Sequence, residues 1–128
     1  MPESSEPKIT VRLETDPQGK PICTPDDSKR HYEIVFEIEN PPTDTYSATF
    51  ELDPSYYDSV REVQPDKDGK IRLKTTTFGD YPVIVHLHRT SGKDIPLREG
   101  VARALKRGRT NLPDDPQIDD ALSYIAEN

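Results

Sequence analysis

The amino-acid sequence predicts a mainly β protein, an antiparallel β-sandwich followed by two short C-terminal helices. Several segments alternate apolar and polar residues, which is typical of strands with one buried face. Turn residues separate these segments, and 13 of the 128 residues are proline. No helical pattern stands between the segments before residue 95, whereas a parallel sheet needs crossover connections. The length fits a single domain.

The N-terminal third of the chain shows the clearest alternation. Proline presets φ and glycine accepts a positive φ, so Pro17 and Gly19 mark a turn. The expected elements here are a strand at 8–14, a turn at 16–19, a short return strand at 20–24, a loop at 25–29 and a strand at 31–39. The apolar positions of the two longer strands are Ile9, Val11, Leu13, Tyr32, Ile34, Phe36 and Ile38.

The middle of the chain continues the pattern up to residue 89. An Asp-Gly pair at Asp68 and Gly69 is typical of a hairpin turn. The expected strands are 45–52, 60–63 and 71–74 around that turn, and 81–89 as the last strand. In the first of these, one face is expected to hold Tyr46, Ala48, Phe50 and Leu52. Short strands at roughly 8–12-residue spacing predict a sandwich of immunoglobulin-like type.

Helical periodicity replaces the alternation after residue 95. Aspartate is a good N-cap and proline suits the first helical position, so Asp115 and Pro116 predict a helix start. Apolar residues recur at helical spacing in two groups, Leu97, Val101, Ala104 and Leu105, and then Ile118, Ala121, Leu122 and Ile125. The expected organisation is a flexible N-terminus at 1–7, a β-sandwich at 8–94 and a helical appendage at 95–128.

Composition excludes several classes of function. The 17 Lys and Arg residues against 24 Asp and Glu give a net charge of −7, and phosphate backbones repel such a chain, so no nucleic-acid partner is expected. The lone Cys23 cannot form an intramolecular disulfide. The N-terminal residues lack the apolar stretch of a signal peptide, and no apolar run has the ~18 residues of a membrane span. We expect a cytoplasmic protein with no membrane partner.

Catalytic motifs are missing from the sequence. It holds no glycine-rich phosphate loop, nucleophile elbow or zincin motif. A Cys23–His31 dyad needs proximity in space, and an ordinary thiol in or near an edge strand is the simpler interpretation. His86 and His88 leave the same face of a strand, but zinc needs a further ligand, so a solvated strand face is favoured. We therefore expect no enzyme activity, no metal and no cofactor.

Two charged clusters accompany the expected helices. Cations at a helix C-terminus and anions at an N-terminus complement the helix dipole. The clusters also have the charges to pair with each other or with a second copy of the chain. The basic cluster is Arg103, Lys106, Arg107 and Arg109, and the acidic one is Asp114, Asp115, Asp119 and Asp120.

Two loops carry aromatic residues beside turn residues. One reads Leu52-Asp53-Pro54-Ser55-Tyr56-Tyr57 and the other reads Thr77-Phe78-Gly79-Asp80-Tyr81. In a sandwich such loops can gather at one end and form a binding surface, as antibody loops do. The alternative is that these aromatic residues plug the ends of the core.

The two loops resemble motifs of the YEATS family, in its prokaryotic branch. Where the family has Leu-His-x-Ser-Phe after a strand, this chain has Leu52-Asp53-Pro54-Ser55-Tyr56. Where the family has Gly-Trp-Gly-Glu-Phe before its final strand, this chain has Thr77-Phe78-Gly79-Asp80-Tyr81. The order of the motifs and the hairpin between them also fit, and the resemblance covers roughly residues 31–90.

The resemblance implies an immunoglobulin-like sandwich whose aromatic loops read acylated lysine. Asp53 stands where the family has histidine, and an aspartate at the rim favours a cationic or hydrogen-bond-donating ligand over an anionic one. By resemblance, Ser55 matches the hydrogen-bonding serine, Tyr56 and Phe78 the flanking aromatics, Tyr81 the aromatic that follows, and Gly79 the glycine that lets the loop turn.

The expected function is that of a non-enzymatic recognition or adaptor module. It binds a modified peptide or a small ligand at the aromatic loop end, with a protein or peptide carrying a modified lysine as the partner. The resemblance to the prokaryotic branch implies a role in bacterial immunity or conflict systems. The alternative is a structural or oligomerising interaction module that binds through its C-terminal helices. The oligomeric state stays open.

Overall fold

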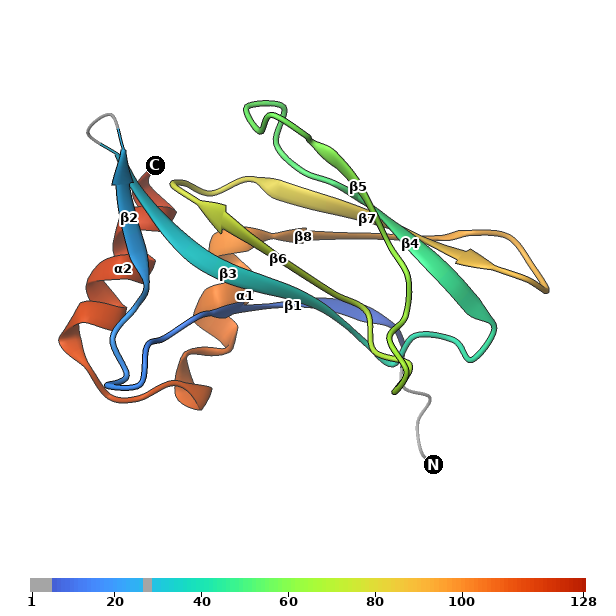
Figure 1. Ribbon diagram of the computed structural model, residues 1–128, viewed down its shortest axis with the longest axis horizontal. Helices are drawn as coiled ribbons and strands as arrows, with labels where there is room; N and C mark the ends of the chain where they lie inside the picture. The colour runs from blue at the N-terminus through green and yellow to red at the C-terminus, as the bar shows by residue number, and fades with distance from the viewer. Residues whose placement is uncertain (1–5, 27–28) are drawn as a thin grey trace.

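Two antiparallel sheets and two helices make up the computed structural model, which describes residues 6–26 and 29–128 (Figure 1). Of the expected flexible N-terminus, residues 1–5 lie outside the described residues. The strands are β1 Lys8–Leu13, β2 Cys23–Asp26, β3 Lys29–Glu39, β4 Thr45–Glu51, β5 Val60–Val63, β6 Arg72–Thr77, β7 Pro82–Arg89 and β8 Ile95–Gly100. The helices are α1 Val101–Arg107, the 3-10 turn η1 Arg109–Asn111 and α2 Pro116–Glu127.

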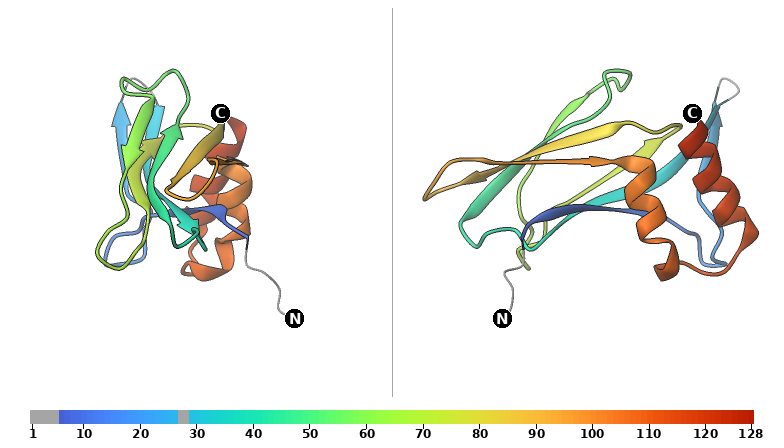
Figure 2. Two further views of the ribbon diagram at one scale, coloured as in Figure 1. Left: turned by 90° about the vertical axis from the view of Figure 1, so that its right-hand side faces the viewer. Right: turned by 180° about the vertical axis from the view of Figure 1, so that it is seen from behind.

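The first sheet is built around β3, the longest strand. β1 pairs with the C-terminal half of β3, and β2 pairs with its N-terminal end. β6 pairs with the middle of β3 on the edge opposite β1. The second sheet has the order β5-β4-β7-β8, with every pair antiparallel. These two sheets confirm the predicted sandwich, and both helices lie at one of its ends (Figure 2).

The core lies between the two sheets and follows the predicted alternation. Phe36 of β3 and Phe50 of β4 are both 0% exposed, and their ring centroids lie 6.1 Å apart. Removing two phenyl rings from water contributes a large share of the stabilisation of so small a domain. The other buried strand residues include Ile9, Val11, Leu13, Tyr32, Ile34, Ile38, Ala48, Val83, Val85 and Leu87.

The expected apolar face of β4 is wrong at its first position. Tyr46 is 56% exposed, whereas Ala48, Phe50 and Leu52 are buried. The pairing of β4 with β7 shifts register between Thr45 and Ser47. A bulge of this kind adds one residue to a strand. The alternation of buried and exposed side chains is therefore interrupted at Tyr46, whose side chain is exposed.

The predicted hairpin around residues 66–69 is also wrong. The turn itself forms, because Asp66 Oδ1 accepts hydrogen bonds from the backbone N–H groups of Asp68 and Lys70, and Gly69 has φ +79°. The strands on either side belong to different sheets, since β5 pairs with β4 and β6 pairs with β3. The turn therefore carries the chain from one sheet to the other.

Two short edge strands differ from the sequence prediction. The return strand expected at 20–24 forms instead as β2, which includes Pro25 of the expected loop. The helical segment expected after residue 95 begins with β8, where Leu97 pairs with Val85 of β7. Both strands lie at sheet edges, where a proline such as Pro25 or Pro96 is tolerated. The last strand thus ends at Gly100 rather than Arg89.

α2 begins as its pattern predicts, and it docks on the protein's own domain. Asp115 Oδ1 accepts a hydrogen bond of 2.8 Å from the Gln117 backbone N–H, and Pro116 is the first helical residue. Ile118, Ala121 and Ile125 are each 0% exposed. Three of the four residues of the predicted stripe therefore pack against the protein's own domain, whereas Leu122 is half-buried. Neither helix in the described part of the chain combines the length and apolarity needed to cross a membrane.

We predict that Ile118→Ala lowers the free energy of unfolding by roughly 2–5 kcal/mol, since it leaves a cavity at a fully buried position. Ser123→Ala, at an exposed position of the same helix, serves as the control and should stay within about 0.5 kcal/mol of the wild type. Urea denaturation measures both. An unchanged midpoint for Ile118→Ala, together with a changed oligomer size, means that the stripe serves a partner instead.

Candidate functional site

A hollow of about 140 Å³ lies where two loops meet at one end of the sandwich. The β4–β5 loop and the β6–β7 loop supply its walls, and Asn128 at the end of α2 completes them. All six sequence-predicted residues line this hollow, which we call the loop-end hollow: Asp53, Ser55, Tyr56, Phe78, Gly79 and Tyr81. Thr77 and Asp80 line it as well. The structure thus brings the predicted residues together, and their role in binding stays a prediction.

The β4–β5 loop is shaped by Asp53. Its Oδ2 accepts a hydrogen bond of 3.0 Å from the Ser55 backbone N–H, and its backbone carbonyl accepts one of 3.0 Å from Tyr56. Hydrogen bonds from the Ser55 hydroxyl, and then from its backbone N–H, hold the pKa of Asp53 below its usual value. Asp53 therefore carries a negative charge at the rim at neutral pH.

Tyr56 and Tyr81 form a hydroxyl chain beneath the hollow. The Tyr81 hydroxyl donates to the Tyr56 hydroxyl at 3.0 Å, and the Tyr56 hydroxyl donates to the backbone carbonyl of Thr76. The two rings meet edge to face with centroids 5.6 Å apart. Burial is the main cause that raises the pKa of both phenols. Both hydroxyls therefore stay protonated and have their donors engaged.

The β6–β7 loop is fixed by its neighbours in space. Thr77 Oγ1 donates to the Gly79 carbonyl at 2.6 Å, and Asp80 Oδ1 accepts a hydrogen bond of 2.9 Å from the Ala102 backbone N–H in α1. A Cβ on Gly79 would lie only 2.7 Å from the backbone carbon of Asn128. The glycine is therefore required by close packing, and not by the positive φ expected of a residue that lets the loop turn.

Phe78 and Tyr56, which match the flanking aromatics of the family by resemblance, have different ring partners. The Phe78 ring lies edge to face with His31, at 5.4 Å between centroids, and Lys29 Nζ lies 4.2 Å from its centroid. The ring partner of Tyr56 is instead Tyr81. Tyr56 and Phe78 thus line the same hollow without forming a slot between two stacked rings.

The core-plug interpretation holds for only part of this aromatic group. Tyr81 is 8% exposed and belongs to the hydrophobic core, and Tyr56 packs against that core. Phe78 is half-buried and lies outside the core cluster. Tyr81 therefore belongs to the core of the fold, whereas the ring of Phe78 contacts His31 and Lys29 outside that core.

Four residues of this region were not foreseen from the sequence. Asp80 and Thr77 lie beside predicted residues, and a loop aspartate near a helix start is a weak signal for a cap. Lys29 and His31 reach Phe78 from β3, whose pairing with β6 puts Tyr32 opposite Thr77. Only the sheet register reveals these two contacts, and the sequence alone does not supply it.

The other candidate groups are Cys23 with His31, and the two histidines of β7. Cys23 is exposed in edge strand β2, while the His31 ring contacts Phe78. His86 Nε2 lies 2.6 Å from Glu51 Oε2, and His88 is held by Thr49 Oγ1 at 2.6 Å and Asp94 Oδ2 at 2.9 Å. Across residues 6–26 and 29–128, no group of three His, Cys, Asp or Glu side chains is placed to hold a metal ion.

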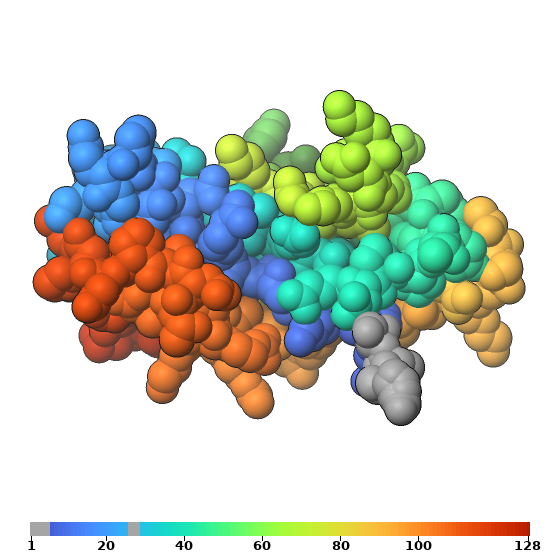
Figure 3. Space-filling model, turned by 90° about the horizontal axis from the view of Figure 1, so that it is seen from below, coloured from blue at the N-terminus to red at the C-terminus, as the bar shows by residue number. Residues whose placement is uncertain are grey.

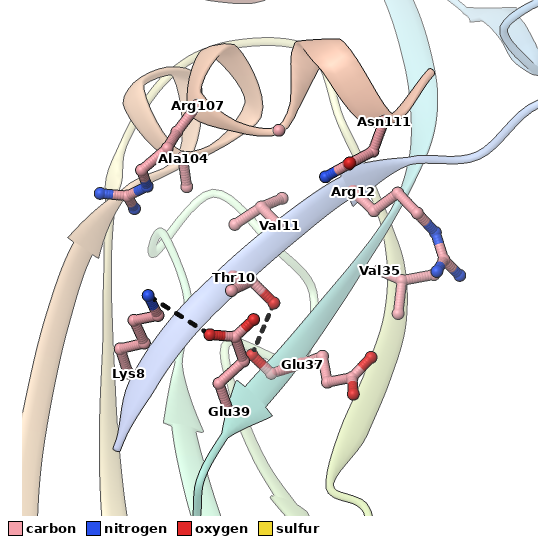
Figure 4. A pocket seen from close by; sticks show the side chains of 11 residues that line it. Lys8, Thr10, Val11, Arg12, Val35, Glu37, Glu39, Ala104, Arg107 and Asn111 are labelled. Carbon is pink, nitrogen blue, oxygen red and sulfur yellow. Dashed lines mark hydrogen bonds and ion pairs between the residues drawn. The ribbon is translucent and has the colours of Figure 1, made fainter. Parts of the chain in front are cut away.

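A larger hollow of about 450 Å³ runs along β1 and contains none of the predicted site residues. Figure 4 shows its polar lining between β1, β3 and α1. The Lys8 ammonium pairs with the Glu39 carboxylate at 3.4 Å, and Thr10 Oγ1 donates to the Glu37 carbonyl at 3.2 Å. These charges and hydroxyls already have partners within the chain, so the loop-end hollow remains the stronger candidate.

Comparison with known proteins gives a match over the region that contains the loop-end hollow. A family model described as the prokaryotic YEATS domain matches residues 32–99. This span is just over half of the chain and contains both loops of the hollow. The search of the curated proteins found no match.

We predict that Asp80→Ala destabilises the protein by about 1 kcal/mol, because the Ala102 N–H loses its acceptor at the start of α1. Asp80→Asn keeps an acceptor oxygen at the same place and should retain most of that stability. Thermal unfolding of the two variants compares them directly. Equal losses in both variants mean that charge, and not capping, sets the contribution of Asp80.

Stability should also fall in alkaline solution because of Tyr56 and Tyr81. The folded protein raises the pKa of both phenols above the ordinary tyrosine value of 10.0, mainly through burial. Their contribution is therefore complete below pH 10 and is lost as the pH rises above it. The Tyr56→Phe/Tyr81→Phe double variant should lose less stability between neutral and alkaline pH than the wild type. Tyr57→Phe, at a fully exposed position, should behave as the wild type in the same urea titrations.

Proposed function

Because the chain belongs to the prokaryotic YEATS domain family, we propose that it is a recognition module that binds a protein or peptide ligand at the loop-end hollow. The observation that carries this proposal is the convergence of two loops on one small hollow with aromatic, hydroxyl and carboxylate groups. Binding sites favour this combination, since apolar surface supplies affinity and a few polar groups fix orientation. We further propose that the module acts in bacterial immunity or conflict systems, the setting that the prokaryotic branch suggests.

The size of the hollow favours a single side chain as the ligand group. Its volume of about 140 Å³ equals that of roughly four or five waters at ~30 Å³ each. The amide end of an acylated lysine is of this size, and its flat apolar part suits the ring of Phe78. We propose a modified lysine as the ligand.

The charge of Asp53 sets a preference among modified lysines. The pKa of its carboxyl is lowered, so the group is ionised at neutral pH. It accepts a hydrogen bond from a ligand amide and repels an anionic ligand. An acetyl-lysine is therefore preferred over a succinyl-lysine, whose added carboxylate would face Asp53.

The same groups favour binding without chemistry. A general acid or base works best when its pKa lies near the operating pH. The pKa of Asp53 is lowered and the pKa values of Tyr56 and Tyr81 are raised, so all three move away from neutrality. We propose that the module is not an enzyme.

The oligomerising alternative has less support. It requires the apolar stripe of α2 to meet a partner, yet Ile118, Ala121 and Ile125 are buried within the chain's own domain. Recognition at the loop end uses a surface that the fold leaves open.

We predict that Phe78→Ala abolishes peptide binding and leaves the melting temperature nearly unchanged, because Phe78 is half-buried and outside the core. The matched control is Tyr57→Ala, which removes a fully exposed aromatic from the neighbouring loop. Peptides carrying acetyl-lysine, succinyl-lysine and unmodified lysine are titrated against the three proteins by fluorescence anisotropy.

The expected order of affinity is acetyl-lysine above succinyl-lysine, with Tyr57→Ala equal to the wild type. If Phe78→Ala unfolds the domain and no peptide of the panel binds the wild type, Phe78 is a core plug and the proposal fails.

A further inference from the structure

A further hollow, formed by the two helices, lies outside the segment that matches the family model. It has a volume of about 550 Å³ and runs between α1 and α2 at the helical end of the molecule, which Figure 3 shows as one continuous surface of α1, η1 and α2. We call it the helix groove. It is lined by Ala102, Arg103, Lys106, Arg109, Asp119, Leu122, Ser123 and Ala126.

The helix groove is held in shape by contacts on both sides. Arg109 joins the helices, since its Nε donates to Asp119 Oδ1 at 2.7 Å and one of its terminal nitrogens donates to the Pro113 carbonyl at 3.0 Å. Beneath the groove, Leu105 of α1 and Ile118 of α2 are buried in the core. A surface that is formed before binding loses less entropy when a partner arrives.

The walls of the groove differ in chemistry. Leu122, Ala126 and Ala102 supply apolar surface, and the small side chains of Ala126 and Ser123 allow another backbone to come close. Helices pack at axis separations of roughly 8–10 Å when the side chains between them are small enough. The shape therefore fits a third helix laid along the first two.

The charge on the α1 wall selects the partner. Arg107 and Arg109 of the basic cluster have carboxylate partners, in Glu99 and Asp119. Among the residues that the structure describes, Arg103 and Lys106 form no ion pair, although the whole chain has a net charge of −7. Two unneutralised cations beside an apolar strip are complementary to carboxylates beside an apolar stripe.

We propose that the helix groove binds an acidic amphipathic helix of a partner protein. The apolar face of that helix packs on Leu122 and Ala126, and its Asp or Glu residues pair with Arg103 and Lys106. This is the helix-in-groove mode of recognition. Addition of a strand is ruled out at this place, because both walls are helices whose backbone groups are already hydrogen-bonded. The groove is separate from the loop-end hollow, so a partner can hold the module while the hollow reads its ligand.

The test uses the full chain and two synthetic probe peptides of about 18 residues, five helical turns. Both carry leucine at helical spacing; one has glutamate along the flanks of the leucine stripe and the other has glutamine. The glutamate peptide should bind the wild type, measured by fluorescence anisotropy, and should bind more weakly as salt is added. The glutamine peptide should bind at least tenfold more weakly.

Four variants locate the binding. Arg103→Glu/Lys106→Glu reverses the charge of the α1 wall, and Ala126→Trp fills the groove at an exposed position without changing charge. Each should weaken the glutamate peptide by about tenfold or more. Arg98→Glu is the control, because it reverses one exposed charge on β8, away from the groove. It should have little effect on binding of the glutamate peptide. Phe78→Ala should bind the peptide as the wild type does, which separates this proposal from the loop-end hollow. Circular dichroism checks that each variant is folded.

Three outcomes overturn the proposal. The first is that the glutamate peptide does not bind, or binds the charge-reversed and wild-type proteins equally. The second is self-association that Arg103→Glu/Lys106→Glu abolishes, with no peptide binding, which assigns the groove to a second copy of the chain. The third is binding to vesicles of anionic lipid, but not to the peptide, which assigns it to a membrane surface.

Discussion

Two hydrogen bonds join the β6–β7 loop to the first turn of α1, and the candidate site depends on them. Asp80 Oδ1 accepts from the Ala102 N–H at 2.9 Å, and the Tyr81 carbonyl accepts from the Val101 N–H at 3.0 Å. The first N–H groups of a helix have no partner inside the helix, so the loop supplies what α1 lacks. In return, α1 holds Asp80 and Tyr81, the two residues directly after Gly79, and so restrains the loop that carries Phe78.

This exchange ties the helices to the sandwich. A helix as short as α1, at seven residues, is not stable alone in water. It exists because Val101, Ala104 and Leu105 are buried and because the loop caps it. The segment that matches the family model ends at residue 99, yet a wall of the loop-end hollow is tied to residues that follow it. The loops and helices of this chain therefore form one structural unit.

The sequence predicts those features that are determined by neighbouring residues. The alternation in β3 and β7 and the Asp115 cap are local patterns, and the structure confirms them. The exposure of Tyr46 and the separation of β5 from β6 depend on strand pairing between distant segments. Turn residues fix a local bend but not the partner of the strand that follows. The gathering of Ser55, Tyr56 and Phe78 followed from motifs in the two loops, whereas Lys29 and His31 reach Phe78 only through sheet register.

The three aromatic residues of the hollow differ in how deeply they are buried, and this difference separates the core from the rim. Tyr81 belongs to the core. Tyr56 packs against the core and accepts a hydrogen bond from the Tyr81 hydroxyl, whereas Phe78 lies outside the core. Because both phenol donors are already engaged, a ligand that enters the hollow meets Asp53, the exposed Ser55 and the ring of Phe78 without disturbing the core. Affinity can then change by substitution at the rim while the fold is held by the buried tyrosine. Under the proposed recognition function, this separation would let the ligand preference change through substitutions in two loops without loss of the fold.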